Sequence, residues 1–388
     1  MKKKKVGCVI ACRENHTNYG SSLVNYSFLK KLQELGADVE IIIYKKTLSF
    51  PQKIAFVVNA ILAGEWKDIA HRIIGDRLVK NHQYEANIAI RTKAVNEYKN
   101  QRFAPYFHEY VGYEALHKGS SNYDIVVVGS DQVWTPMSLP NKYFNLLFVD
   151  DNVPKASYAS SFGVSEIPVF QRKATGKYLN RLKMIGVREI SGKKIVESLS
   201  HNKATVVADP TLLLDKNEWE QEIKDVIIDN SEKYIFCYFL GTNPEARRAA
   251  NQLKKRTGCK IITIRHMDEY VPEDENFGDK APYNVGPNEF IKYISQATYV
   301  CTDSFHCTAF SIQFQRPFMT FYRFASKSKT SKNTRIDSLF SILEMDRKHI
   351  YNGDISLIDS PINWENTSYK LNQLRCDSIE FMKKILSL

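Results

Sequence analysis

Short apolar runs alternate with amphipathic segments along most of the chain. Residues 6–11 form an apolar run, and residues 21–35 then show the 3.6-residue spacing of a helix that Gly36 ends. Another apolar run follows at residues 39–44. This order predicts a β-loop-α-β unit, the building block of an α/β fold with a parallel sheet.

The same alternation continues to the end of the sequence. Strands are expected at residues 123–128, 155–160, 184–187, 205–208, 234–240, 261–264, 298–301 and 317–322. Helices are expected at residues 243–256, 288–296 and 304–315. Residues 215–232 are polar and charged, so we place a domain border there. The pattern predicts two Rossmann-like domains, residues 1–222 and 223–388, with a cleft between them that suits a small molecule.

Residues 51–110 break this alternation and have helical character, with an apolar face formed by Ile54, Val57, Val58, Ile61 and Leu62. We predict a helical insertion in the first domain. The segment from residue 45 to residue 102 also contains eleven Lys and Arg residues against five Asp and Glu residues. This surplus suits nucleic acid, anionic lipid headgroups at the inner membrane surface or an acidic polymer, although a solvated helical face is the commonest explanation.

Composition narrows the functional classes. The chain has 388 residues, of which 43% are hydrophobic and 25% charged, and its formal net charge is +11. The length suggests two domains, the composition suggests a soluble cytoplasmic protein, and no transmembrane helix is expected because no window approaches ~18 consecutive apolar residues. Seven cysteines without a CxxC pair argue for reduced thiols and against a metal site. The first β-loop-α unit lacks GxGxxG, which disfavours a nicotinamide or flavin cofactor.

Polar side chains follow the ends of several expected strands. They are Asn18, Asp131, Gln132, Arg188, Asp209, Asp303 and His306, with Lys332 and Arg335 on the loop after the last strand. Open α/β sheets bind ligands at the carboxyl ends of their strands, where helix N-termini favour an anion. Basic groups, an imidazole and several carboxylates or amides at this edge suit an anionic substrate and a partner that bears hydroxyl groups.

Seven motifs in this order resemble the polysaccharide pyruvyl transferase family over nearly the whole chain. They are NYG at residues 18–20, VGSDQVW at 128–134, SSFG at 160–163, VRE at 187–189, DPTLL at 209–213, GPNEFI at 286–291 and TDSFH at 302–306. The resemblance implies two Rossmann-like domains in a GT-B-like arrangement. It also implies phosphoenolpyruvate as donor, without a further cofactor, and a sugar of a surface polysaccharide or its lipid-linked precursor as acceptor.

The resemblance also implies roles for individual residues. Arg188 matches the arginine that holds the donor's negative charge, and His306 matches the histidine of the active site. Many members of the family carry an arginine two positions before that histidine, whereas this chain has Ser304. Lys332 or Arg335 would then supply the missing positive charge.

The expected reaction is ketal formation. His306 is our candidate for the general acid and base, because imidazole side chains titrate near neutral pH. Arg188 would hold a carboxylate or phosphate as a planar fork. Asp131 and Gln132 would orient the acceptor's hydroxyl groups. We also place Asp303 and Ser304 in the substrate site.

Two further residues have no assigned step in this reaction. Trp134 offers an apolar face to a sugar ring or, equally, packs in the core. Asp209, which precedes a proline, we take to be mainly structural.

Two other functions remain open from the sequence. A GT-B glycosyltransferase that uses a nucleotide sugar would have the same architecture, and fold does not fix function. A non-catalytic protein that binds nucleic acid or an acidic glycan through the basic segment belongs to another class, but the sequence lacks an interleaved basic-aromatic motif and we expect no nucleic-acid partner. It predicts binding that depends steeply on salt and survives the His306→Ala substitution.

Overall fold

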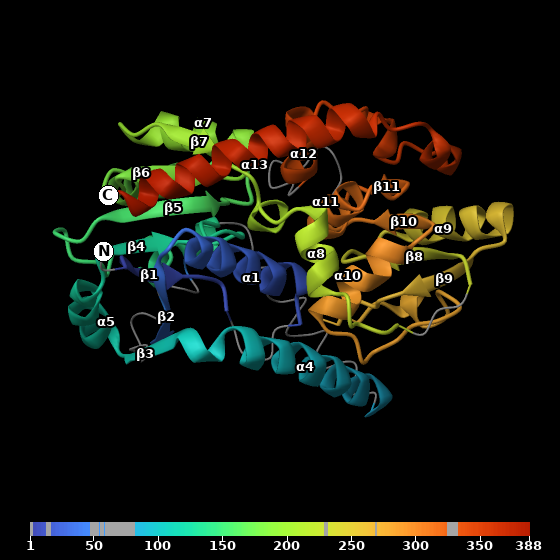
Figure 1. Cartoon of the computed structure of the whole chain (residues 1–388), viewed down its shortest axis with the longest axis horizontal. Helices are drawn as coiled ribbons and strands as arrows, with labels where there is room; N and C mark the ends of the chain where they lie inside the picture. The colour runs from blue at the N-terminus through green and yellow to red at the C-terminus, as the bar shows by residue number, and fades with distance from the viewer. Residues whose placement is uncertain are drawn as a thin grey trace.

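Two parallel β-sheets lie side by side in a computed structural model of the chain (Figure 1). The structure describes residues 3–12, 17–46, 54, 58, 82–228, 232–267, 270–323 and 333–388. The first sheet has seven strands in the order β3-β2-β1-β4-β5-β6-β7, and the second has four in the order β11-β10-β8-β9. The α/β class that the sequence predicts is therefore confirmed.

The first sheet is built around short, buried strands. Its strands are β1 (Lys5–Val9), β2 (Asp38–Lys45), β3 (Phe107–Val111), β4 (Ile125–Val128), β5 (Lys155–Ser160), β6 (Met184–Val187) and β7 (Ala204–Val206). Its helices are α1 (Tyr19–Glu34), α4 (His82–Arg102), α5 (Tyr113–Gly119), α6 (Val169–Leu179), α7 (Ile190–Leu199) and α8 (Lys216–Glu222). Every residue of β4 and β5 is buried, as expected for central parallel strands that are covered on both faces.

Edge strand β3 differs from the sequence prediction. The helical prediction for residues 51–110 holds for α4, but residues 107–110 belong to β3, which pairs in parallel with β2. Phe107, His108 and Glu109 are exposed at the edge of the sheet, so β3 lacks the apolar alternation that marks a strand. Of the predicted apolar face, Ile54 and Val58 are described and about half exposed, and the other three residues lie outside the described residues.

The second sheet follows the expected alternation closely. Its strands are β8 (Tyr234–Tyr238), β9 (Lys260–Thr263), β10 (Tyr299–Thr302) and β11 (Phe318–Thr320). Its helices are α9 (Pro244–Thr257), α10 (Pro287–Gln296), α11 (Phe305–Gln313), α12 (Thr334–Ile342) and α13 (Trp364–Leu386). All nine residues of α11 are buried, so this helix lies inside the protein.

The last helix, α13, returns to the first sheet (Figure 1). The Ser378 hydroxyl accepts a hydrogen bond of 2.8 Å from the Ala208 amide, and the Phe381 ring packs on Tyr158 of β5. Helix α13 therefore packs against the first sheet, although it belongs to residues 223–388, which we assigned to the second domain. The domain border at residues 222 and 223 remains a prediction, and it falls between the last strand of one sheet and the first strand of the other.

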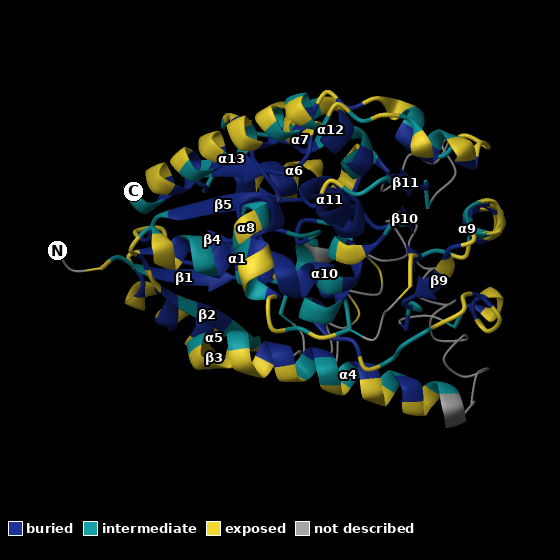
Figure 2. Cartoon of the chain, turned by 45° about the vertical axis from the view of Figure 1, so that its right-hand side comes forward, coloured by how far each residue is buried: buried dark blue, intermediate teal, exposed yellow. Residues whose placement is uncertain are grey.

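Helix α4 runs along one side of the molecule past both sheets, with a buried and an exposed face (Figure 2). Its Arg91 is buried and donates hydrogen bonds to the Tyr283 and Pro282 carbonyls, at 2.8 and 2.9 Å. Arg102 pairs with Glu222. These two members of the basic segment therefore connect elements of the fold, Arg91 from a buried position and Arg102 from a partly exposed one.

One hydrophobic cluster joins the two sheets. It includes Val6 and Tyr19 from the first half of the chain and Phe290 and Phe310 from the second. Tyr19 stacks on Phe290 with ring centroids 4.7 Å apart, and its hydroxyl donates to the Val285 carbonyl. Helix α1 is thereby fixed against the second half of the protein. None of the helices among the described residues is long and apolar enough to span a bilayer.

Candidate active site

Asp209 occupies the centre of the cluster of polar side chains at the carboxyl ends of the strands. It follows β7, and Pro210 prevents that strand from continuing. Its Oδ1 accepts hydrogen bonds from the amide and hydroxyl of Thr211, at 3.0 and 2.7 Å. Its Oδ2 is thus left for two partners from other elements. Arg188 Nη1 donates to it at 2.7 Å, and His306 Nε2 lies 3.7 Å away.

Arg188 follows β6 and is buried among carboxylates. Besides Asp209, its Nε donates to Glu189 at 3.3 Å, and its Nη2 lies 3.9 Å from Asp131 Oδ1. Burial works to lower the pKa of Arg188, but the three carboxylates outweigh it and raise that pKa above its usual value. Buried Nη2 has no hydrogen-bond partner among the described residues, which leaves this donor available to a ligand.

His306 lies in the first turn of α11 and is 7% exposed. Ser304 caps this helix, because its hydroxyl accepts from the Cys307 amide at 3.4 Å. One face of the imidazole meets the first turn of α1, where a β-carbon on Gly20 would fall 2.0 Å from Nδ1. His306 Nε2 is buried without a hydrogen-bond partner. Residue 20 must therefore be a glycine for the imidazole to occupy this position.

Asp131 lies just beyond β4 in a conformation that few residues other than glycine adopt. Its φ is +86°, its backbone bridges to Ser160, and its Oδ1 accepts from the Gln132 amide at 2.8 Å. Burial raises the pKa of Asp131, but Arg188 and His306 outweigh it and hold the pKa below its usual value. The carboxylate is therefore ionised at neutral pH and able to accept a hydrogen bond from a hydroxyl group.

Phe305 forms an aromatic wall between two guanidinium groups. The Arg188 Cζ lies 4.9 Å from the centre of its ring, and the Arg335 Cζ lies 5.8 Å from it. Such contacts stabilise a cation by roughly 0.5–2 kcal/mol, depending on exposure. Arg335 comes from the first turn of α12, so the structure brings this predicted residue to the cluster. Lys332 lies outside the described residues.

Asp303 has a structural task. Its two carboxylate oxygens accept hydrogen bonds from the Leu240 and Gly241 amides, at 2.7 and 2.8 Å. Arg323 donates to its backbone carbonyl. With both oxygens bonded to the loop after β8, Asp303 holds that loop, and Ser304 caps α11. Their expected place in the substrate site remains a prediction.

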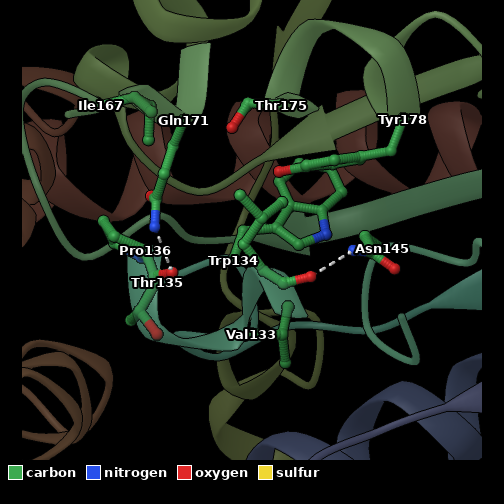
Figure 3. A pocket seen from close by; sticks show the side chains of 10 residues that line it. Val133, Trp134, Thr135, Pro136, Asn145, Ile167, Gln171, Thr175 and Tyr178 are labelled. Carbon is green, nitrogen blue, oxygen red and sulfur yellow. Dashed lines mark hydrogen bonds between the residues drawn. The ribbon is translucent and has the colours of Figure 1, made fainter. Parts of the chain in front are cut away.

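Trp134, for which we left a sugar platform and core packing equally open, is 4% exposed. Its indole N–H donates to the Phe144 carbonyl at 3.0 Å, and its ring packs on Phe162 and Tyr178. Figure 3 shows it beside Tyr178 in the wall of a cavity of about 10 Å³. This volume admits about one water molecule and excludes a sugar ring. Core packing, the alternative that we left open, describes its environment.

The remaining predicted residues lie at the margin of the cluster. Asn18 caps α1 through a hydrogen bond of 3.3 Å from the Ser21 amide, one turn from the helix's contact with His306. Gln132 is partly exposed beside Asp131 and approaches Gly163.

The sequence analysis missed several members of the cluster: Gly20, Glu189, Phe305 and the central role of Asp209. Asp209 was among the strand-end residues of the sequence analysis, but we took it to be mainly structural because it precedes a proline. Among the described residues, no group of three or more His, Cys, Asp or Glu side chains is arranged to hold a metal ion.

Comparisons with known proteins agree with this architecture. The sequence profile of the family Polysaccharide pyruvyl transferase matches residues 18–323. No curated protein sequence matches the chain. Among solved structures, UDP-GlcNAc 2-epimerase from Neisseria meningitidis bound to UDP-GlcNAc has a TM-score of 0.50 and 10% identity, over 98% of this chain and 100% of that one.

Two other solved structures are similar over their whole length. The N-terminal domain of trehalose-6-phosphate phosphatase from Candida albicans has a TM-score of 0.53 and 11% identity, over 100% of this chain and 97% of that one. MnaA from S. aureus in complex with UDP has a TM-score of 0.50 and 9% identity, over 99% and 98%. At such low identity these likenesses show the fold alone, which is the GT-B-like arrangement of two Rossmann-like domains.

Proposed function

The chain belongs to the polysaccharide pyruvyl transferase family, and we propose that it transfers pyruvate from phosphoenolpyruvate to a sugar of a surface polysaccharide or its lipid-linked precursor. One observation carries the proposal beyond the family: His306 and Arg188, from different sheets, meet at the same oxygen of Asp209. A proton donor and an anion-binding group thus lie within one cluster, as a reaction of an acid phosphate requires.

The proposed reaction proceeds by addition and elimination. A proton added to the methylene carbon of phosphoenolpyruvate makes the central carbon electrophilic, and a sugar hydroxyl attacks that carbon and loses its proton. Phosphate then leaves with the electrons of its C–O bond. A second hydroxyl of the sugar attacks the same carbon and loses its proton, which closes the cyclic ketal. No oxidation or reduction takes place, so phosphoenolpyruvate is the only donor that the chemistry needs.

His306 is the residue that we assign to the first proton transfer. The carboxylate of Asp209 lies 3.7 Å from its Nε2 and helps to position the imidazole. Such acid-base catalysis typically contributes about 10²–10⁴-fold to the rate. Asp209 acts through His306 and is therefore a positioning residue in this scheme.

Asp131 and Gln132 are the groups that we assign to the acceptor. The ionised Asp131 carboxylate accepts the hydroxyl proton, and the partly exposed Gln132 side chain supplies an amide for a second hydroxyl. The free Nη2 of Arg188 donates one hydrogen bond to the donor's carboxylate.

The test is release of phosphate from phosphoenolpyruvate by the purified protein with a panel of glycoside and lipid-linked sugar acceptors. Acceptor-dependent release, together with the mass increment of a pyruvate ketal on the sugar, supports the proposal. Release of nucleoside diphosphate from a nucleotide sugar, without phosphate release from phosphoenolpyruvate, would instead support the glycosyltransferase alternative. Salt-sensitive glycan binding without either reaction would support the non-catalytic one.

A further inference from the structure

Arg188, the arginine to which the sequence resemblance assigns the donor's negative charge, is already neutralised by neighbouring carboxylates. Arg188 is surrounded by Asp209 at 2.7 Å, Glu189 at 3.3 Å and Asp131 at 3.9 Å. One positive charge therefore faces three carboxylates. A phosphate dianion placed against Arg188 alone would meet a surplus of negative charge, so its counter-charge must come mainly from another residue.

Arg335 differs from Arg188 in its surroundings. It is partly buried in the first turn of α12, and no carboxylate among the described residues lies within ion-pair distance of it. Its Nε is buried without a hydrogen-bond partner, and the contact that the structure gives its guanidinium is the Phe305 ring. A buried charge without a partner is costly, and it is found where a ligand completes the site.

The electrostatic surroundings of Arg335 fit this reading. Burial and the positive charges of Arg188 and Arg323 outweigh the carboxylates of Glu189 and Asp131 and lower the pKa of Arg335 to about 10. The guanidinium remains ionised at neutral pH. An anion bound beside it would supply the close negative partner that these more distant carboxylates do not.

Two helix N-termini add to the positive potential at this place. Phe305 begins α11 and Arg335 lies in the first turn of α12, and the two side chains are in contact. The dipoles of both helices therefore favour an anion beside Arg335.

We propose that Arg335 forms the phosphate subsite of the active site, with Arg188 contributing the single donor Nη2 to the carboxylate. The assignment deepens the proposed function and rests on it for the identity of the donor. It also chooses between the two cations that the sequence offered as a replacement for an arginine at position 304. The phosphate then lies on the Arg335 side of Phe305.

Thermal unfolding in the presence of inorganic phosphate tests the subsite directly. Phosphate should raise the melting temperature of the wild-type protein in a concentration-dependent way, because a ligand stabilises the state that binds it. The Arg335→Gln variant should be at least as stable as wild type without phosphate, since it loses an unpaired cation. It should bind phosphate about tenfold to a hundredfold more weakly, as expected for the loss of a charge-assisted hydrogen bond.

Two further variants make the comparison specific. Arg335→Lys keeps the positive charge but loses the planar guanidinium group with its paired N–H donors, so it should retain part of the phosphate affinity. Arg248→Gln removes one positive charge from an exposed site on α9, where the arginine makes a loose pair of 3.8 Å with Glu245. This control should respond to phosphate as the wild type does.

The outcomes separate this inference from the proposed function. If Arg335→Gln responds to phosphate like the wild type, the subsite assignment is overturned, whatever the transfer activity of the protein. If phosphate binding depends on Arg335 but the wild type never turns over phosphoenolpyruvate, the subsite stands and the proposed donor is wrong. Wild-type protein that shows no response to phosphate at all would also refute the subsite.

Discussion

Gly20 and His306 are in direct contact, although 286 positions separate them: a β-carbon on Gly20 would fall 2.0 Å from Nδ1 of the imidazole. Gly20 belongs to α1 of the first sheet, and His306 belongs to α11, which follows the second sheet. The position of the imidazole thus depends on an element from the other half of the protein. The proposed acid is available only when both halves are in this arrangement.

The Gly20→Ala substitution should therefore affect catalysis more than folding. Alanine favours a helix over glycine by about 1 kcal/mol, which offsets part of the strain. The new methyl group must displace the His306 ring from its position beside Asp209. We expect turnover to fall by about a hundredfold, the cost of misplacing a reacting group by roughly 1 Å. Turnover per folded molecule and the melting temperature measure the two effects.

Gly36→Ala is the matched control. Gly36 follows α1 with a φ of +87°, and no atom lies within 4 Å of the place of its β-carbon. This substitution should lower the melting temperature through backbone strain and leave turnover per folded molecule unchanged. Wild-type turnover in Gly20→Ala would show that the imidazole position is not needed.

The Asp209→Asn substitution should be destabilising as well as inactivating. It removes the charge that Arg188 and His306 share in a fully buried place. Breaking a buried ion pair by removing one partner typically costs about 3–5 kcal/mol. Urea unfolding at neutral pH measures this loss, with the exposed Asp151→Asn variant as a control that should change little.

Asp209 also predicts a dependence of stability on pH. Burial raises the pKa of Asp209, but His306 and Arg188 outweigh it and hold that pKa well below its usual value. Since the folded-state pKa is below the unfolded-state value of about 3.9, the stabilisation is present above that pH. It is lost as the pH falls further. The gap between wild type and Asp209→Asn should therefore narrow below about pH 4, and a gap that stays constant there would contradict the assignment.

Substitutions at Trp134 distinguish a core residue from a sugar platform. Trp134→Ala should lower the free energy of unfolding by about 3–5 kcal/mol, because a large buried ring leaves a cavity. Trp134→Phe should restore much of that stability. Both variants should keep the wild-type Michaelis constant for the acceptor per folded molecule. A large increase in that constant with Trp134→Phe would return the residue to the acceptor site.

The architecture was predictable from the sequence because it depends on local patterns. The buried run of β4 and the change from β10 to the capped helix α11 are visible in the apolar spacing and in Ser304. Strand β3 was not predictable, because an exposed edge strand with His108 and Glu109 carries no periodic signal.

The site was predictable in part, for a different reason. Strand ends identified His306, Arg188, Asp131 and Arg335, since parallel strands bring their carboxyl ends to one edge. Which atoms meet there depends on tertiary packing. No local pattern shows that Arg188 and His306, from the two halves of the protein, approach the same oxygen of Asp209.

The burial of Trp134 likewise depends on tertiary packing. Its covering rings, Phe162 and Tyr178, come from residues far along the chain.

The most direct test of the proposed mechanism is a single-turnover assay of phosphate release from phosphoenolpyruvate with a competent acceptor, comparing wild type with His306→Asn. We expect the variant to keep the circular dichroism spectrum and to lose about 10²–10⁴-fold in rate, the usual contribution of a positioned acid. A folded His306→Asn protein that releases phosphate at the wild-type rate would contradict the account.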